Sequence, residues 1–307
     1  PFWLKLARAV RPFLLAAATP SKKLMRSRAL RRLLAIVPVL AADRGGWDAT
    51  CDASSGSCRS DGGEAGSCCP SGSWPALQPP EDYKPRGMDE FLEDLPVYVA
   101  GQPGPKAVVV LPEIFGFAGR LKGICDTLAD EGYFVVMIDS FRGDSVVGKA
   151  NPLEWIAKTP FDTVVGPDLK RVFSYLETQG ASSVGALGFC WGAWAFCKAS
   201  AAGFPFKAGA GAHPRIALEA AAFGGDEAAL ARGVAMPVLL LPAGNDGPAV
   251  KPGGQVAGLL AAAGGSSHEY PGMARGWVTR GDLRDAAVKR DAEDAMRRIL
   301  AHFKAHL

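Results

Sequence analysis

The sequence predicts an α/β fold in which a mostly parallel central sheet is covered by helices on both faces. Short runs of β-branched and apolar residues alternate with longer segments of helical periodicity, and 307 residues that are 48% hydrophobic are enough to bury such a core. This alternation is typical of parallel sheets, because each crossover helix returns the chain to the same edge. It extends over residues 88–307, which we expect to form one domain of roughly seven or eight strands.

The expected strands are short apolar runs that end at turn-forming residues. In chain order they cover residues 96–101, 106–113, 134–140, 183–188, 207–213, 237–244 and 266–272.

Three segments place apolar residues on one helical face, and they cover residues 120–133, 167–180 and about 283–306. The first two end at glycine, which commonly stops a helix. The apolar stripes are Leu121, Ile124, Cys125 and Leu128 in the first, Leu169, Val172, Phe173 and Leu176 in the second, and Val288, Ala292, Ala295, Ile299 and Phe303 in the third.

The first 50 residues differ in charge from the rest of the chain. They carry ten Lys and Arg against two acidic residues, whereas the remainder carries 24 basic and 29 acidic residues. A basic, acid-poor segment containing "RRLLAIVPVLAAD" fits a targeting segment, which would send the protein to a plastid or mitochondrion, or otherwise leave it in the cytoplasm. An amphipathic surface extension that docks on protein partners is the alternative.

The apolar run within the first 50 residues is too short to span a bilayer. The excess of acidic residues in the remainder of the chain argues against nucleic-acid binding. The chain begins with Pro1, so we expect it to be processed or part of a longer one.

Residues 51–87 form a Gly- and Ser-rich linker and leader with its own cysteines. Cys51, Cys58, Cys68 and Cys69 lie there, and Cys125, Cys190 and Cys197 lie in the apolar body. A small secreted disulfide scaffold would be denser in cysteine, so we expect reduced surroundings, although a Cys51–Cys58 disulfide stays open. Adjacent Cys68 and Cys69 do not give the paired spacing of a zinc site, and no metal is expected.

The segment Gly188-Phe189-Cys190-Trp191-Gly192 follows an expected strand and precedes a helix. Flanking glycines in this context are typical of a nucleophile elbow, which lifts the side chain above the sheet. The Trp191 N–H would then face a developing oxyanion, and the helix N-terminus would lower the pKa of the thiol. The alternative is a buried structural cysteine beside closely packed glycines.

Two carboxylates also follow expected strands. Asp246, in "LPAGNDG", stands where the acid of an α/β-hydrolase triad belongs in chain order, although a turn-forming aspartate explains it as well. Glu113, in "LPEIFGF", ends a buried strand and must find partners or stay neutral. It could hold the Cys190 thiol, and the Ile114 N–H could be the second oxyanion donor.

With these residues, the chain resembles the dienelactone hydrolase family of α/β-hydrolases. The motifs that carry the resemblance are "CCPSG", "YVAG", "LPEIFGF", "DSFRGD", "GFCWGAWA", "GAHP", "AGNDG" and "YPGMARGW", which run in family order over about residues 68–307.

This resemblance implies cleavage of small esters or lactones without a cofactor. It implies the following roles: Cys190 as nucleophile, Asp246 as triad acid, Glu113 as the carboxylate that contacts the thiol, Ile114 and Trp191 as oxyanion donors, and Arg142 with Arg280 as anchors for a substrate carboxylate.

The chain departs from the family at the position of the triad histidine, where alignment on "GW" places Arg275. Arginine has no acceptor and stays charged, so it cannot move the proton, although it could pair with Asp246 and hold a thiolate by charge. Glu113 is the nearest candidate to replace the base, whereas His213, in "GAHP", is expected to pack rather than substitute. A weak hydrolase and a non-catalytic binding protein of the same fold both remain open.

Overall fold

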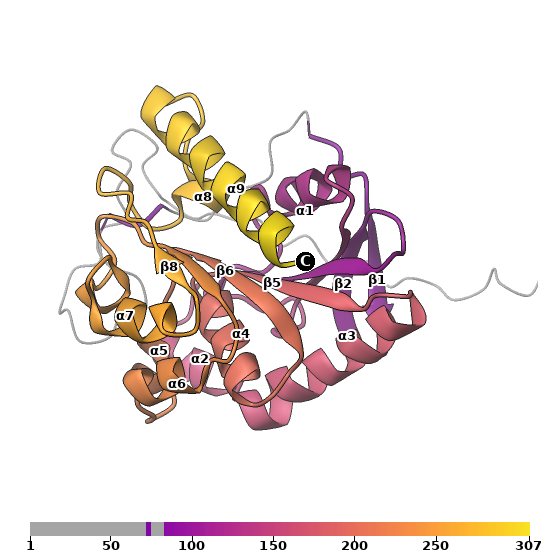
Figure 1. Ribbon diagram of the computed structural model, residues 1–307, viewed down its shortest axis with the longest axis horizontal. Coiled ribbons are helices and arrows are strands. Elements are labelled where there is room, and N and C mark those ends of the chain that lie inside the picture. The colour runs from indigo at the N-terminus through magenta and orange to yellow at the C-terminus, as the bar shows by residue number, and fades with distance from the viewer. Residues whose placement is uncertain (1–71, 75–82) are drawn as a thin grey trace, which may run out of the picture. The chain divides into compact units, whose positions relative to one another are not determined.

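The computed structural model describes residues 72–74 and 83–307, and it confirms the α/β-hydrolase fold (Figure 1). The predicted targeting segment and the four leader cysteines lie outside the described residues. Eight strands form one sheet in the order β1-β2-β4-β3-β5-β6-β7-β8, in which the pairs β1–β2 and β2–β4 are antiparallel and the other pairs are parallel. The strands are β1 (Met88–Leu92), β2 (Leu95–Ala100), β3 (Lys106–Leu111), β4 (Phe134–Ile138), β5 (Ser183–Phe189), β6 (Phe206–Ala212), β7 (Val238–Leu241) and β8 (Ser266–Ser267).

Two strands differ from expectation. β1 is a half-polar edge strand that the sequence pattern did not predict, because only one side of it packs on the protein. The strand expected over residues 266–272 shortens to Ser266–Ser267, followed by a single bridge between Ala243 and Tyr270. Pro271, which has no N–H to donate, comes directly after that bridge.

Helices cover both faces of the sheet (Figure 1). α1, α8 and α9 pack on one face, and α3, α4, α6 and α7 pack on the other. The helices are α1 (Leu121–Asp130), α2 (Pro152–Ala157), α3 (Gly166–Thr178), α4 (Trp191–Ala201), α5 (Leu218–Ala221), α6 (Glu227–Gly233), α7 (Gln255–Ala261), α8 (Trp277–Arg280) and α9 (Ala286–His306), with a π-turn at Phe161–Val165 and a 3₁₀ turn at Pro248–Val250.

The apolar stripe predicted for the last helix is the buried face of α9. Half of its other residues are Lys, Arg, Asp or Glu. Within the described part of the chain, no helix combines the length and the apolar character that crossing a membrane requires.

The register of the parallel strands brings four loops to one edge of the sheet. Leu111 pairs with Gly188, Phe189 with Ala212, and Ala212 with Leu241. The residues that follow β3, β5, β6 and β7 therefore lie side by side, which is where open α/β sheets carry their chemistry.

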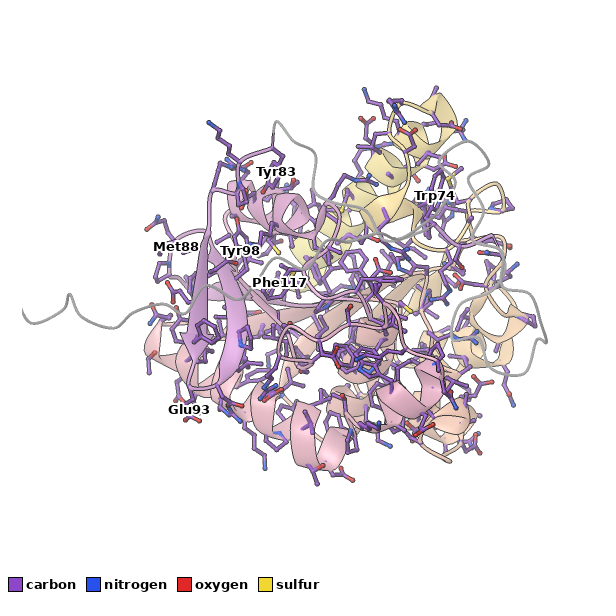
Figure 2. The ribbon with its side chains drawn as sticks, turned by 180° about the vertical axis from the view of Figure 1, so that it is seen from behind. Trp74, Tyr83, Met88, Glu93, Tyr98 and Phe117 are labelled. Atoms are coloured by element: carbon purple, nitrogen blue, oxygen red, sulfur yellow. The ribbon has the colours of Figure 1, made fainter. Side chains whose placement is uncertain are left out.

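The described residues before β1 also contact the domain, upstream of the boundary expected at residue 88. The Tyr83 hydroxyl and the Arg86 N–H both donate to Asp126 Oδ2 of α1, the latter at 3.0 Å, and the Tyr98 hydroxyl donates to Asp126 Oδ1 at 2.7 Å. Figure 2 shows Tyr83 and Tyr98 close together beside α1. Part of the segment that the sequence assigns to a leader is thus fixed to the fold.

Replacing Gly192 with alanine is expected to destabilise the protein by ~1–3 kcal/mol or more. A Cβ there would lie 2.0 Å from the Leu111 carbonyl oxygen, so α4 would have to move away from β3. Gly258→Ala is the matched control, because Gly258 also lies in a helix and a Cβ there meets nothing within 4 Å. The free energy of unfolding of this control should rise by up to ~1 kcal/mol, because alanine has a higher helix propensity than glycine. Denaturant unfolding measures both, and equal midpoints for the two variants would contradict the close packing of α4.

Candidate active site

Cys190 lies in a sharp turn between β5 and α4. Its φ of 53° is in the left-handed region that residues other than glycine rarely adopt, and Trp191 begins the helix directly after it. The Cys190 N–H donates to the Ala212 carbonyl (3.2 Å), and its carbonyl accepts from the Arg215 N–H (3.1 Å), which fixes the turn against the end of β6. The geometry is that of the predicted elbow, and strain held by surrounding contacts is typical of functional sites.

Two backbone N–H groups beside this turn have no acceptor among the residues that the structure describes. They belong to Trp191 and to Ile114, which follows β3, and both residues are buried. Ile114 and Trp191 come after strand ends that are neighbours in the sheet. Buried N–H groups without acceptors are uncommon, and an oxyanion hole is built from donors of this kind.

Glu113 is a buried carboxylate paired with Arg280. Arg280 Nε donates to Oε1 (2.9 Å), Arg280 Nη2 donates to Oε2 (2.8 Å), and the Thr279 hydroxyl also donates to Oε1. Burial raises the pKa of Glu113, but Arg280 and the neighbouring His213 together more than offset this and hold the pKa well below its usual range. The hydrogen bonds described for this carboxylate go to Arg280 and Thr279, and the expected contact with the Cys190 thiol is not among them.

Asp246 and Arg275 form a second buried ion pair, as the sequence allowed. Arg275 Nη2 donates to Asp246 Oδ1 and to the Pro214 carbonyl (3.1 Å), and Asp246 Oδ2 accepts from the Ala243 N–H (2.8 Å). The Arg275 N–H donates to Asn245 Oδ1 (2.8 Å), which ties the loop before α8 to the loop after β7. Position 275 is therefore held where a side chain reaches the carboxylate.

His213 follows β6 and borders this cluster. Its side chain is fully buried between the Phe189 and Trp277 rings, and Nε2 lies 3.5 Å from Glu113 Oε2. Neither ring nitrogen makes a hydrogen bond within the described part of the chain, and φ is 40°. Burial lowers the pKa of His213 despite the opposing effect of Glu113, so the ring is neutral at neutral pH.

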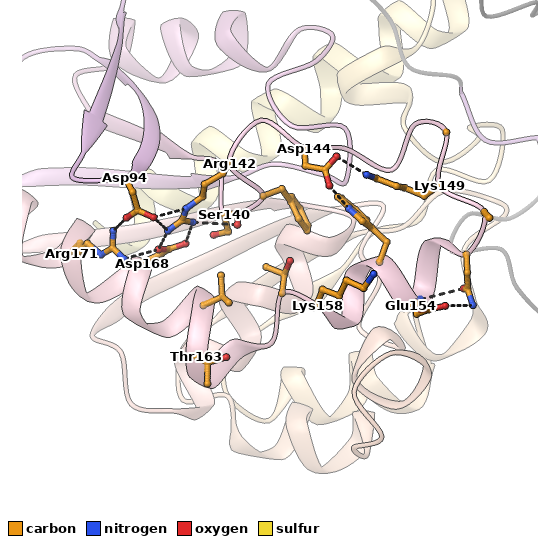
Figure 3. Close-up of a pocket in the computed structure, with 17 residues that line it drawn as sticks. Asp94, Ser140, Arg142, Asp144, Lys149, Glu154, Lys158, Thr163, Asp168 and Arg171 are labelled. Carbon is orange, nitrogen blue, oxygen red and sulfur yellow. Dashed lines mark hydrogen bonds and ion pairs between the residues drawn. The ribbon is translucent and has the colours of Figure 1, made fainter.

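Arg142 takes a different position from the other predicted residues. Its guanidinium lies beside a pocket of about 790 Å³, where it binds Asp168 and Asp94 (Figure 3). The adjacent residue Phe141 does contact the elbow, because its ring packs against Trp191 at 4.7 Å between centroids. Arg142 thus pairs with Asp94 and Asp168, apart from the other predicted residues. Neighbouring loops carry those other residues, which are Cys190, Glu113, Ile114, Trp191, Asp246, Arg275 and Arg280.

Three residues that bind the predicted site residues were not expected from the sequence. Thr279 binds Glu113, and Asp168 binds Arg142. Trp74 lies beside α8 and α9 (Figure 2), where its N–H donates to the Arg275 carbonyl (3.0 Å) and its carbonyl accepts from Arg280 Nη1. The sequence around Asp168 does carry one pattern, because an acidic residue beside Pro167 is common in the first turn of a helix. That pattern predicts where the helix begins and does not indicate an arginine partner.

A model of the dienelactone hydrolase family matches residues 95–307. An endo-1,3;1,4-beta-D-glucanase of Zea mays is 38% identical over 110 residues, which are 34% of this chain and 35% of that protein. Dienlactone hydrolase 1 of Gibberella moniliformis is 30% identical over 152 residues, which are 44% of this chain and 58% of that protein. The chain therefore spans between a third and three fifths of the length of these two relatives.

A solved structure from Klebsiella pneumoniae subsp. pneumoniae, whose name is that of a dienelactone hydrolase, has the same fold. Its TM-score is 0.54 at 23% identity, and the match covers 68% of this chain and 92% of that chain. The family model matches more than half of this chain, and the loops described above follow the strands of the family's fold. This chain belongs to the dienelactone hydrolase family.

Proposed function

We propose that this protein hydrolyses small carboxylic esters or lactones through a thioester on Cys190. The observation that carries the proposal is the strained Cys190 turn at the N-terminus of α4, next to two N–H groups, of Ile114 and Trp191, without described acceptors. A helix N-terminus favours the thiolate, and paired N–H groups favour the oxyanion that forms when a thiolate attacks a carbonyl. Family membership supports this substrate class.

The reaction has two halves. In the first, the Cys190 thiolate attacks the carbonyl carbon, the C–O bond to the alkoxy group breaks, and the alkoxide takes up a proton. In the second, water loses one proton as it attacks the thioester, the C–S bond breaks and restores the thiolate, and the carboxylic acid that is released loses its own proton to solvent. Each half therefore needs a group that moves a proton.

The arginine at position 275 makes that proton transfer the weak step. The family resemblance places a histidine there, whereas Arg275 carries no acceptor and its guanidinium binds Asp246. Loss of a general acid–base group typically lowers a rate by ~10²-fold to 10⁴-fold. Glu113 does not replace it, because a carboxylate held ionised by Arg280 is a poor base. We therefore propose a weak or altered activity.

A non-catalytic role in binding or assembly is the second candidate, and the closure of the site favours it. Cys190, Glu113, Asp246 and Arg275 each expose 5% or less of their surface. The Trp74 backbone also binds both Arg275 and Arg280. A protein that keeps the fold and uses another surface needs no access to the thiol.

Peptide mass spectrometry after incubation with p-nitrophenyl acetate separates these candidates. We expect acylation of Cys190 and not of Cys125 or Cys197. All three are buried, but only Cys190 lies at the N-terminus of a helix, and burial raises the pKa of the other two thiols. The Cys190→Ala variant should release p-nitrophenol no faster than buffer does. Equal acylation of the three cysteines, or none at Cys190, would exclude the thioester mechanism and favour the binding role.

A further inference from the structure

The residues that follow β3, β5 and β6 continue the register of these parallel strands. The pairing of β3 with β5 places Glu113 opposite Cys190, and the pairing of β5 with β6 places Cys190 opposite His213. Two hydrogen bonds support the second pair, because the Cys190 N–H donates to the Ala212 carbonyl at 3.2 Å and the Cys190 carbonyl accepts from the Arg215 N–H at 3.1 Å. Paired backbones in a sheet are about 5 Å apart. His213 is therefore the neighbour of the thiol-bearing residue.

The His213 and Glu113 side chains meet across the strand that lies between them. β3 and β6 flank β5, and yet His213 Nε2 is 3.5 Å from Glu113 Oε2. Both side chains must therefore lean toward each other over the end of β5. Phe189, the last residue of that strand, packs its ring against the imidazole at 6.0 Å between centroids. Cys190 comes directly after Phe189, so the imidazole is held beside the turn that carries the thiol.

The His213 ring is in the form that can accept a proton. Neither of its nitrogens makes a hydrogen bond within the residues that the structure describes, and burial lowers its pKa, so the neutral ring keeps an acceptor nitrogen at neutral pH. Glu113 and Asp246 favour the protonated ring, and Arg275 opposes it. Since Arg280 pairs with Glu113, two carboxylates and two arginines balance around an imidazolium that forms during the reaction.

The other histidines lie away from the elbow. The chain has four histidines, all of them in the described part. His268 follows β8 and packs against Tyr270, and His302 and His306 lie on α9. Only His213 follows a strand that pairs with β5.

We propose that His213 transfers the protons of this site, in place of the histidine that the resemblance puts at position 275. The inference rests on the proposed ester hydrolysis. In the first half, the S–H bond of Cys190 breaks, the proton moves to the ring, and the imidazolium gives it to the alkoxide as the C–O bond breaks. In the second half, the ring takes one proton from the attacking water and returns it to the thiolate that the breaking C–S bond restores. No carboxylate hydrogen bond fixes the tautomer of this ring, so the transfer is less effective than in a complete triad.

Three variants test the role of His213 in hydrolysis. His213→Gln removes the titratable ring, and His213→Phe keeps an aromatic ring against Phe189, so that one variant is available if the other folds poorly. We expect kcat for p-nitrophenyl acetate to fall about tenfold or more in both, because an imperfectly oriented base is worth less than the usual ~10²-fold to 10⁴-fold. His268→Gln is the matched control, because it removes a histidine that also packs against an aromatic ring, and its kcat should equal that of wild type.

The pH profile separates proton transfer from a structural role. Wild-type kcat should fall in acid through an apparent pKa below the ordinary histidine value of 6.5, because burial lowers the pKa of His213 and only the neutral ring is a base. Both His213 variants should lose this acid limb, and His268→Gln should keep it. A lower rate with the acid limb intact would show that His213 only packs, and it overturns the inference.

Alkylation of Cys190 by iodoacetamide, followed by peptide mass spectrometry, gives a readout that does not depend on hydrolysis. The rate at neutral pH should fall in both His213 variants and stay unchanged in His268→Gln, because the thiol loses the group that takes its proton. Equal rates in all four proteins, or no alkylation of Cys190 in wild type, overturn the inference. If wild type is alkylated at Cys190 but hydrolyses no ester, the proposed function fails, and the alkylation rates still decide whether His213 takes the thiol proton.

Discussion

Replacing Arg275 with histidine is expected to raise ester hydrolysis by ~10²-fold to 10⁴-fold, the usual worth of general acid–base catalysis. The backbone of residue 275 is fixed by Asn245 and Trp74, so an imidazole there starts from the position that now reaches Asp246. Asp246 already accepts from the Ala243 N–H, which leaves its other oxygen to orient the ring. The measurement is kcat/KM for p-nitrophenyl acetate, with a new acid limb in the pH profile from protonation of the imidazole.

Two control variants decide whether the gain comes from a restored triad. Arg275→Met removes the cation without supplying a base and should give no gain. Adding Asp246→Asn to Arg275→His should abolish most of the gain, because Asp246 must fix the tautomer of the ring. A folded Arg275→His protein without any gain would show that the family mechanism has been lost more deeply than by one substitution, and the binding role would then be preferred.

Arg280→Met is expected to destabilise the fold by ~3–5 kcal/mol, the usual result of removing one partner of a buried ion pair. Glu113 would remain buried with only Thr279 and the neutral His213 beside it. Arg284→Met is the control, because the Arg284 side chain is 91% exposed and such surface pairs contribute ~0–1 kcal/mol. Denaturant unfolding at neutral pH measures the free energy of unfolding of both variants. A similar small decrease in the two would contradict a stabilising role for the Glu113–Arg280 pair.

The effect of Arg280→Met should also depend on pH. The pKa of Glu113 is lower in the folded protein than its ordinary value of 4.5, so its ionised form stabilises the fold fully above that value. This stabilisation is lost as the pH falls below about 4.5 toward the folded-state pKa. The difference in unfolding free energy between wild type and Arg280→Met should therefore narrow in acid. If this difference stayed constant with pH, the stability lost in Arg280→Met would come from packing rather than from the charge of Glu113.

The fold could be predicted from sequence because its signals are local. The stripes in α1 and α9 follow helical spacing, and the glycines around Cys190 mark a turn that only small residues allow. Gly188 shows why: a Cβ there would lie 2.5 Å from the carbonyl carbon of Gly192. A pattern confined to a few neighbouring residues reports such constraints directly.

The pairing of the charged residues could not be predicted in this way. Asp168 and Arg142 are 26 positions apart, and Glu113 and Arg280 are 167 apart. Nothing in the residues around Arg142 distinguishes an arginine that faces a ligand from one that binds a neighbouring helix. The same holds for His213, whose local sequence fits a packed residue and gives no sign of the Glu113 carboxylate 3.5 Å away. Such contacts follow from the register of the sheet.

The hydrogen bonds to Asp126 decide where a shortened recombinant chain can begin. A fragment that started at Met88 would lose Tyr83 and Arg86, and this buried carboxylate would keep only the Tyr98 hydroxyl. The edge formed by β1 and β2 would lose its attachment to α1 through residues 83–87. A fragment cut at the apparent start of the sheet would therefore be a poorer folding unit than one that retains Tyr83, and retaining Trp74 as well would preserve the backbone contacts to Arg275 and Arg280.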